Sequence, residues 1–347
     1  MRENILNNNN EITRKTGKYH TFIPIDCVLG HYPLLKCEQV KNNNVIVWRN
    51  NDYPRISQNP SVVGFINEKI DNFGMGAGGV RNISGTSSLT IELEKSLADW
   101  LRTELILIFP TGFGSKDAAL QYSILLLDDL VVFSKKNNHA FIINAVRQSA
   151  ERRKIVKHNS VQYLITLLQK YPQKTKKLII FVSLHSLDGN TVPISDCTPI
   201  KGIVAAAKVY GCFTFLYEMH AISMCGSDGC NISGELGISS EILQITMAKA
   251  LGSVGSFIAT ENIFIDAIRF FHFKFVFTTT LPPASIVADT MAIKIIQSFS
   301  NQMETLQIQT PEPCRALMNN SLPVTQHSNT DVSPLLAGDT GNSETLK

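Results

Sequence analysis

The feature of this sequence that most restricts its fold is a series of short apolar runs separated by segments of helical periodicity. Uninterrupted apolar runs of this length are typical of strands covered on both faces, and the chain has them at residues 105–109, 130–134, 178–183 and 212–217. Helical patterns lie between and after the runs, at residues 114–127, 140–152, 161–170, 200–210 and 263–271. This alternation predicts an α/β fold with a mostly parallel central sheet and helices on both faces.

Composition divides the chain into three predicted parts. Residues 1–45 are mostly polar and are expected to form an irregular N-terminal segment. Residues 46–299 carry the alternating pattern and are predicted to form one large domain. Residues 300–347 are rich in Ser, Thr, Asn and Pro and are expected to be loosely ordered. Further predicted elements are a strand at 45–48 and helices at 60–70, 89–101 and 284–299.

Charge and composition argue against several classes of function. The 347 residues carry a formal net charge of +3, which is too small to indicate a nucleic-acid partner. No apolar run approaches the roughly 18 residues of a membrane span, so no integral membrane association is expected. The seven cysteines include no C-x-x-C pair. Cys225 and Cys230 with His220 resemble part of a metal site, but their spacing does not fit a zinc knuckle, so reduced thiols of an intracellular protein and no metal are expected.

A single lysine, Lys249, lies among apolar and small residues at positions 244–252, with Thr246 three positions before it. Burial of an ammonium group is costly and lowers the lysine pKa, and the neutral amine can then attack a carbonyl group. The alternative interpretation is a lysine that extends from a buried turn to solvent. A glycine-rich loop at residues 74–87 precedes an amphipathic helix, which is weak evidence for a ligand site because turns alone can require glycine.

Polar residues follow the predicted strands of the sheet. In open α/β sheets, ligands bind at the carboxyl ends of the strands. These polar residues are therefore expected to converge on one crevice. They are Thr111, Gly112, Asn138, His139, Ser186, Asp188, Gly189 and His220.

Seven short motifs, in this order, resemble those of the α-oxoamine synthases, which are pyridoxal-phosphate enzymes of the type I aminotransferase fold. The motifs begin at Asn51, Gly76, Asn138, His185, Tyr217, Thr246 and Phe277. The second motif, GAGGVRNISGT, is similar to the GAGGTRNISGT of the 5-aminolevulinate synthase branch, and the last, FTTTLPP, is similar to FTTSLPP. The resemblance covers residues 17–300 and implies the large domain of that fold, followed by a truncated small C-terminal domain.

The resemblance implies roles for particular residues. Lys249 would bind pyridoxal 5'-phosphate covalently and move protons at the substrate α-carbon. His139 would stack on the cofactor ring, and His220 would hydrogen-bond the ring hydroxyl. Other cofactor contacts would come from Thr111, Gly112, Phe113, Ser186, Tyr217 and Thr246, and from Thr278 and Thr279 of a second subunit. Substrate contacts would come from Asn51, Asn82 and Ser186.

The implied reaction is the decarboxylative condensation of glycine with succinyl-CoA to 5-aminolevulinate, CoA and carbon dioxide, the first step of haem synthesis. The implied assembly is a homodimer with sites at the subunit boundary. Two alternatives stay open: a family member that uses a different amino acid and acyl-CoA, and a non-catalytic copy of the fold. The implied compartment is the mitochondrial matrix in a eukaryote and the cytoplasm in a bacterium.

The chain also departs from the family pattern. Tyr217 stands where the family has an aspartate that keeps the pyridine nitrogen protonated, and a phenol carries no negative charge at neutral pH. Glu218 is not expected to replace this aspartate, because successive strand side chains point to opposite faces. Val182, His20 and Val80 stand at a glutamate, an arginine and a threonine of the family.

Overall fold

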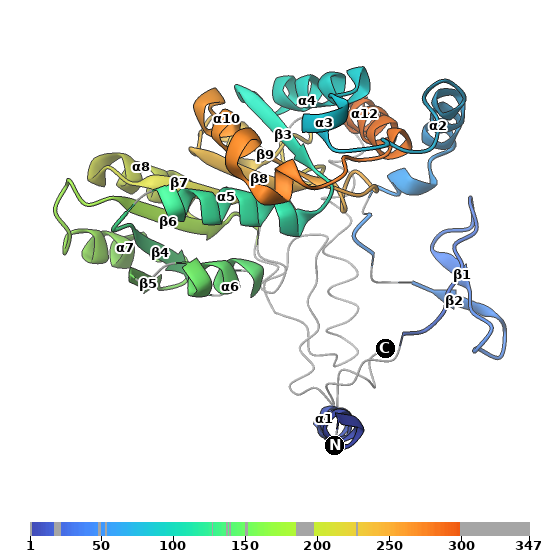
Figure 1. Cartoon of the computed structure of the whole chain (residues 1–347), viewed down its shortest axis with the longest axis horizontal. Coiled ribbons are helices and arrows are strands. Elements are labelled where there is room, and N and C mark those ends of the chain that lie inside the picture. The colour runs from blue at the N-terminus through green and yellow to red at the C-terminus, as the bar shows by residue number, and fades with distance from the viewer. Residues whose placement is uncertain are drawn as a thin grey trace, which may run out of the picture.

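The computed structural model describes residues 2–16, 22–47, 50–52, 54–126, 128–136, 138, 140–149, 152–184, 198–226 and 228–298. Within these residues a seven-stranded sheet runs through the centre of the molecule (Figure 1). Its strands, in spatial order, are β3 (Leu105–Phe109), β9 (Ser256–Thr260), β8 (Ile242–Thr246), β7 (Phe213–Tyr217), β6 (Lys177–Val182), β4 (Val131–Lys135) and β5 (Arg152–Val156).

The sheet is mostly parallel, as the sequence predicts. Strands β5, β4, β6, β7 and β8 pair in parallel, whereas β9 is antiparallel to both of its neighbours, β3 and β8. Parallel neighbours need crossover connections, and the helices between the strands supply them. The parallel strands therefore end at one edge of the sheet, where the residues that follow β7 and β8 lie close together.

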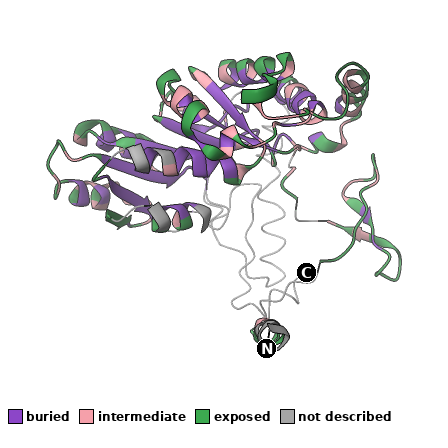
Figure 2. Cartoon of the chain, viewed as in Figure 1, coloured by how far each residue is buried: buried purple, intermediate pink, exposed green. Residues whose placement is uncertain are grey.

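Two hydrophobic cores cover the two faces of the sheet. In β3, Ile106 and Ile108 belong to one core, and Leu107 and Phe109 belong to the other, because alternate strand residues face opposite sides. The first core includes side chains of α2 (Pro60–Phe73), α4 (Ser88–Leu101), α7 (Val161–Leu168), α8 (Ile200–Tyr210) and α12 (Pro283–Ser298). The second includes side chains of α5 (Gly112–Leu126), α6 (Ala140–Ser149), α10 (Asn262–Phe271) and α11 (Phe273–Val276). Figure 2 shows the buried strands between these helices.

The chain before α2 contains more regular structure than predicted. Helix α1 (Arg2–Lys15) and strand β1 (Leu34–Lys36) lie where an irregular segment was expected, and β1 pairs antiparallel with β2 (Asn44–Ile46), which overlaps the strand predicted at 45–48. The sequence of α1 is mostly polar and contains four consecutive asparagines, so the hydrophobic pattern does not reveal this helix. Short helices η1 (Ile56–Gln58), α3 (Arg81–Ser84) and α9 (Ile232–Glu235) complete the described elements.

The helix predicted at residues 140–152 is too long. Helix α6 ends at Ser149, and Arg152 begins the edge strand β5. The three basic residues of this strand, Arg152, Arg153 and Lys154, are exposed. Exposed charges discourage further pairing at a sheet edge, and they also make the segment resemble a helix end. The predicted boundary at residue 299 and the whole of 300–347 lie outside the described residues. Among the helices described, none is long and apolar enough to cross a membrane.

Candidate active site

The amine of Lys249 lies at the carboxyl ends of β7 and β8. Lys249 follows β8, and its Nζ is 2.8 Å from Nε2 of His220, which lies three residues beyond the end of β7. Asn51 approaches from the N-terminal part of the chain, with its Oδ1 at 3.5 Å from the same Nζ. The sequence predicts all three residues for one site. Asn51 and Lys249 are 198 residues apart in the sequence, yet they meet with His220 around one amine.

Burial makes this amine unusually easy to deprotonate. The Lys249 side chain is half-buried, and desolvation lowers its pKa to about 8. His220 is buried beside it and offers a ring nitrogen that can accept or donate a proton. A lysine with a lowered pKa next to a histidine is suited to attack a carbonyl group and to transfer protons afterwards.

A close approach of two loops holds Asn51 at this amine. The carboxylate of Asp52 accepts hydrogen bonds from the backbone N–H groups of Ile56 at 2.8 Å and Ser57 at 3.0 Å. Gly252, three residues after Lys249, has a φ of +66°, and a Cβ added there would lie 2.7 Å from the Ser57 nitrogen. Only glycine fits this contact, so any side chain at position 252 would push Asn51 away from Lys249.

The start of α5 forms a polar corner near Lys249. Thr111 begins the helix, and its Oγ1 accepts a hydrogen bond from the Gly114 N–H at 3.0 Å. A Cβ added to Gly112 would lie 3.9 Å from Oγ1 of Thr246, so the helix start faces the hydroxyl that ends β8. Free backbone N–H groups at a helix start attract anions. The corner is therefore suited to a phosphate group.

Buried hydrogen bonds fix the helix start against the sheet. Ser115 accepts a hydrogen bond from Nε2 of Gln244 at 2.9 Å, and its Oγ lies 2.6 Å from Oγ of Ser256. Ser256 also donates to the Thr111 carbonyl oxygen at 2.9 Å. Gln244 and Ser256 belong to β8 and β9, so α5 cannot shift without breaking bonds that are shielded from water.

The end of β7 forms the third side of the site. Tyr217 is buried, and burial raises its pKa further, so its phenol is neutral at physiological pH. Val182 is its register partner on β6, which places a second apolar side chain at the same level. The Nζ of Lys116, on α5, lies 4.3 Å from the centre of the Tyr217 ring. Lys116 was not among the predicted site residues.

Glu218 lies on the other face of the sheet from Tyr217, as expected from strand alternation. Its Oε2 accepts hydrogen bonds from Asn231 Nδ2 and Ser233 Oγ, both at 2.7 Å. The carboxyl group is fully buried, and burial raises its pKa to about 7. Glu218 therefore belongs to a separate polar cluster and does not replace the missing aspartate.

The remaining predicted residues have different positions. His139 and Ser186 lie outside the described residues. Phe113 is half-exposed beneath Nζ of Lys274, which is 4.3 Å from its ring centre. Thr278 is half-buried and Thr279 is exposed. Within the described ranges, no three His, Cys, Asp or Glu side chains are grouped so that they could hold a metal ion.

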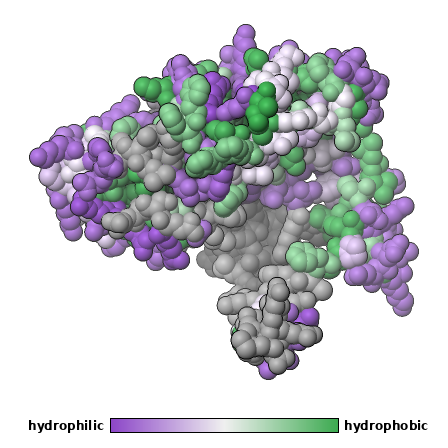
Figure 3. Space-filling view, in the orientation of Figure 1, coloured by the Kyte–Doolittle hydropathy of each residue, from purple (hydrophilic) through white to green (hydrophobic). Residues whose placement is uncertain are grey.

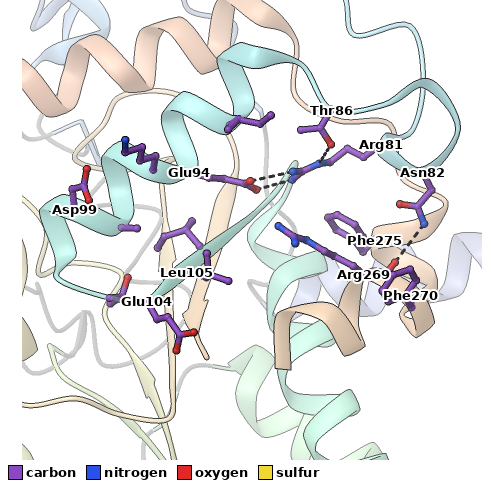
Figure 4. Close-up of a pocket in the computed structure, with 15 residues that line it drawn as sticks. Arg81, Asn82, Thr86, Glu94, Asp99, Glu104, Leu105, Arg269, Phe270 and Phe275 are labelled. Atoms are coloured by element: carbon purple, nitrogen blue, oxygen red, sulfur yellow. Dashed lines mark hydrogen bonds and ion pairs between the residues drawn. The ribbon is translucent and has the colours of Figure 1, made fainter. Parts of the chain in front are cut away.

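Asn82 lines a separate cavity of about 810 Å³. Its Nδ2 donates to the carbonyl oxygen of Arg269 at 3.4 Å, and Arg81 forms two hydrogen bonds with Glu94 across the same cavity (Figure 4). Lys249 is not among the residues that line this cavity. The structure thus does not bring Asn82 to the amine within one chain.

Comparisons with known proteins place the chain in a family. The family model for aminotransferase class I and II matches residues 43–333. The chain is also 34% identical to a 5-aminolevulinate synthase of Bradyrhizobium diazoefficiens, with 93% of this chain and 78% of the relative covered. The chain belongs to the class I and II aminotransferases and, within them, to the 5-aminolevulinate synthase family. A mitochondrial 5-aminolevulinate synthase of Yarrowia lipolytica is 31% identical over 97% of this chain and 62% of its own length.

Solved structures agree with this fold. The serine palmitoyltransferase of Sphingomonas wittichii has a TM-score of 0.81 at 20% identity and covers 94% of this chain and 79% of its own. The 8-amino-7-oxononanoate synthase of Francisella tularensis has a TM-score of 0.66 at 20% identity, with 82% of this chain and 78% of its own covered. At these identities the likeness shows the fold alone.

Members of this family depend on pyridoxal phosphate, and the donor set fits that cofactor at two of its groups. The Lys249 amine, with its lowered pKa, suits the aldehyde. The start of α5, with Gly112 open toward the Thr246 hydroxyl, suits the phosphate. At the third group, the ring nitrogen, the family pattern has a carboxylate, whereas this chain has the buried side chains of Tyr217 and Lys116.

Proposed function

We propose that this chain is a pyridoxal-phosphate-dependent acyltransferase that condenses glycine with succinyl-CoA to 5-aminolevulinate, with release of CoA and carbon dioxide. The observation that carries the proposal is the Lys249–His220 pair at 2.8 Å, at the carboxyl ends of neighbouring strands. Sequence identity with 5-aminolevulinate synthases over most of the chain supports the choice of reaction. The proposed product class is therefore an aminoketone.

Lys249 is the proposed attachment point and proton carrier of the site. When bound, pyridoxal phosphate supplies an electron-withdrawing ring that stabilises negative charge at the substrate α-carbon. Lys249 would hold the cofactor between turnovers and, once displaced by the amino group of glycine, would move a proton at the α-carbon. His220, within hydrogen-bond distance of the Lys249 amine, would orient that amine and share its proton.

The start of α5 is the proposed phosphate site. Gly112 allows close backbone approach, and Thr111 and Thr246 present hydroxyl groups on either side. The hydrogen bonds of Ser115 to β8 and β9 hold this helix start in place before the cofactor binds. Cofactor binding then requires little rearrangement of the protein, which favours affinity. Asn51, which reaches Lys249 from the opposite side, is the proposed substrate contact within this chain.

We also propose that the chain functions as a homodimer. Four phenylalanines, which we call the aromatic patch, are each more than 70% exposed: Phe270, Phe271, Phe273 and Phe277. They belong to or follow α10 and α11, where Figure 3 shows hydrophobic side chains gathered at the surface. An exposed apolar patch of this kind indicates a protein contact. Thr278 directly follows the patch, so a second copy on this patch would receive Thr278 and Thr279 near its own site.

Substitution of one patch residue tests the dimer. Phe273→Glu is expected to convert the protein to monomers, because a carboxylate would be buried at the contact. Val209→Glu, at an equally exposed apolar position of α8, is the matched control and is expected to leave the assembly unchanged. Sedimentation velocity measures both. A wild-type protein that sediments as a monomer with cofactor bound would exclude the dimer.

A turnover assay tests the proposed reaction. The wild-type protein, loaded with pyridoxal phosphate, is expected to release 5-aminolevulinate from glycine and succinyl-CoA. The rate should be roughly a hundredfold below that of a relative with a carboxylate at position 217, because one preorganised charge is absent. Lys249→Ala is expected to abolish the product, whereas Lys208→Ala, an exposed lysine of α8, is not. Cofactor bound at Lys249 without any product from these substrates would contradict the substrate assignment.

A further inference from the structure

A second lysine, Lys116, is buried near Lys249 at the end of β7. Lys116 lies on the first turns of α5, and only 6% of its surface is exposed. Its Nζ lies 4.3 Å from the centre of the Tyr217 ring, close to the electron-rich face of the phenol. Helix α5 lies near β7 in front of the sheet (Figure 1). The contact with Tyr217, the last residue of β7, places this buried ammonium at the strand end.

The electrostatics of this pair are those of a cation over a neutral ring. Tyr217 is buried and uncharged at neutral pH, and its neighbour across the register is Val182. Burial and the nearby charge of Lys249 lower the pKa of Lys116 to about 8. Glu218, which follows Tyr217, is directed to the other face and hydrogen-bonded there. Asp117, which follows Lys116, has its Oδ2 at 2.6 Å from Nζ of Lys274. A bound acceptor within reach of this ammonium would form a charge-assisted hydrogen bond with it.

The positions of the other groups decide which part of the cofactor meets this pair. In pyridoxal phosphate the ring nitrogen lies para to the carbon that carries the aldehyde. With the aldehyde carbon joined to Lys249 and the phosphate at Gly112, the nitrogen is directed away from the Lys249 amine. Tyr217, with Lys116 above it, ends the strand next to β8, which makes this pair the candidate neighbour of the ring nitrogen.

We propose that Lys116 donates a hydrogen bond to the ring nitrogen of bound pyridoxal phosphate and holds that nitrogen unprotonated, with the Tyr217 ring positioning the ammonium. The inference rests on the proposed cofactor site at Lys249. An ammonium group is a donor only, so it pairs with the lone pair of a neutral pyridine nitrogen. A protonated nitrogen would bring two cations together in a buried place, which is unfavourable.

The absent aspartate at position 217 is therefore not the only change expected at the ring nitrogen, because Lys116 adds an ammonium group there. A neutral pyridine ring withdraws electrons less strongly than a pyridinium ring. The expected result is a cofactor that is bound specifically but activates the substrate α-carbon weakly. It also follows that Tyr217→Asp introduces a carboxylate directly beside Lys116, which would pair with that ammonium before it could charge the ring.

Two cofactor analogues test the contact without any measurement of turnover. One is 1-deazapyridoxal phosphate, which has a carbon in place of the ring nitrogen, and the other is N-methylpyridoxal phosphate, whose ring is permanently cationic. Wild-type protein is expected to bind pyridoxal phosphate at least about tenfold more tightly than the deaza analogue, as for a hydrogen bond to a charged donor. The N-methyl analogue is expected to bind most weakly. Equilibrium dialysis gives the three dissociation constants.

Lys116→Met is the decisive variant, since methionine matches the length of the lysine stem and suits an apolar environment. It is expected to bind pyridoxal phosphate and the deaza analogue within about twofold of each other. Lys208→Met, on the exposed surface of α8, is expected to keep the wild-type preference. An unchanged preference in Lys116→Met would overturn the inference, as would borohydride trapping of the cofactor on Lys116.

The wild-type measurements keep the inference testable even if Lys116→Met does not fold. A wild-type protein that binds the N-methyl analogue as tightly as pyridoxal phosphate would overturn the role of Lys116. A wild-type protein that binds none of the three compounds would contradict the proposed cofactor site itself.

The absorbance of the bound cofactor gives a second readout, because ring protonation changes the spectrum. It is expected to change with pH in Tyr217→Asp/Lys116→Met and to stay nearly constant in wild type.

Discussion

The lowered pKa of Lys249 leads to a specific pH dependence for covalent cofactor attachment. Only the neutral amine attacks an aldehyde, and with a pKa of about 8 the neutral fraction is small at pH 6 and nearly complete above pH 9. The attachment rate is therefore expected to rise about tenfold from pH 6 to pH 7 and to level off near pH 9. Stopped-flow absorbance measures this rate. A rate that continues to rise to pH 10.5, as for an exposed lysine, would show that Lys249 is not desolvated.

Glu218 is expected to make the stability of the fold depend on pH. Burial raises its pKa from 4.5 to about 7, so between these values the folded state holds a proton that the unfolded state releases. This contribution is full below pH 4.5 and is lost as the pH rises to 7, by on the order of 3 kcal/mol. Urea unfolding of wild type and Glu218→Gln at several pH values measures the contribution of Glu218 to the free energy of unfolding. The difference between the two free energies should change across this window, whereas exposed Glu92→Gln should follow wild type.

At the residue level, the sequence predicts the chemical groups better than their surroundings. Lys249, His220 and Asn51 were all proposed from motif order, and the structure brings them together. Lys116 was missed because a single lysine at the start of a helix carries no sign of the strand end beneath it. Its contact with Tyr217 depends on how α5 crosses β7, which is a tertiary property.

One ion pair links three elements next to the glycine-rich loop. Arg81 of α3 donates to both oxygens of Glu94 of α4, at 2.6 and 3.0 Å. The same Glu94 accepts from the backbone N–H of Ile108 in β3 at 3.0 Å. Both side chains are close to fully buried, so loss of either partner leaves the other as an uncompensated buried charge.

A double-mutant cycle measures this coupling. Arg81→Met and Glu94→Met are each expected to cost about 3 kcal/mol of unfolding free energy, and the double variant less than the sum of both. Lys95→Met, an exposed position on the same helix, should change the free energy by no more than about 0.5 kcal/mol. Denaturant unfolding gives all four values. Strictly additive costs would mean that the pair contributes no coupling to the fold.

At the level of elements, most helices and the inner strands follow from local pattern. Strand β3 and helix α8 have the predicted bounds, because each is an uninterrupted pattern ended by turn residues. Strands β8 and β9 were not predicted, since short runs containing Gln244, Ser256 and Thr260 lack the continuous apolar character of the inner strands. Their polar side chains are buried, and they hydrogen-bond to Ser115 of α5 or to the backbone of Glu241, just before β8.

At the level of the whole molecule, the alternation of strands and helices predicts the fold class but not the strand order. The order β3-β9-β8-β7-β6-β4-β5 joins strands that lie far apart in the sequence, and β9 inserts antiparallel between β3 and β8. Local periodicity contains no information on such pairings. The rule that ligands bind at the carboxyl ends of parallel strands nevertheless predicted a crevice that includes His220, after β7, whereas the place of Lys249 in the site came from the motif resemblance.

The most direct test of the whole account is to identify the residue that binds the cofactor. The purified wild-type protein is incubated with pyridoxal phosphate, reduced with borohydride, digested and analysed by peptide mass mapping. The expected result is a reduced cofactor on Lys249 alone, and its loss in Lys249→Ala but not in Lys208→Ala. A cofactor attached to another lysine, or no attached cofactor in a folded wild-type protein, would contradict the proposal that the Lys249–His220 pair forms the active site.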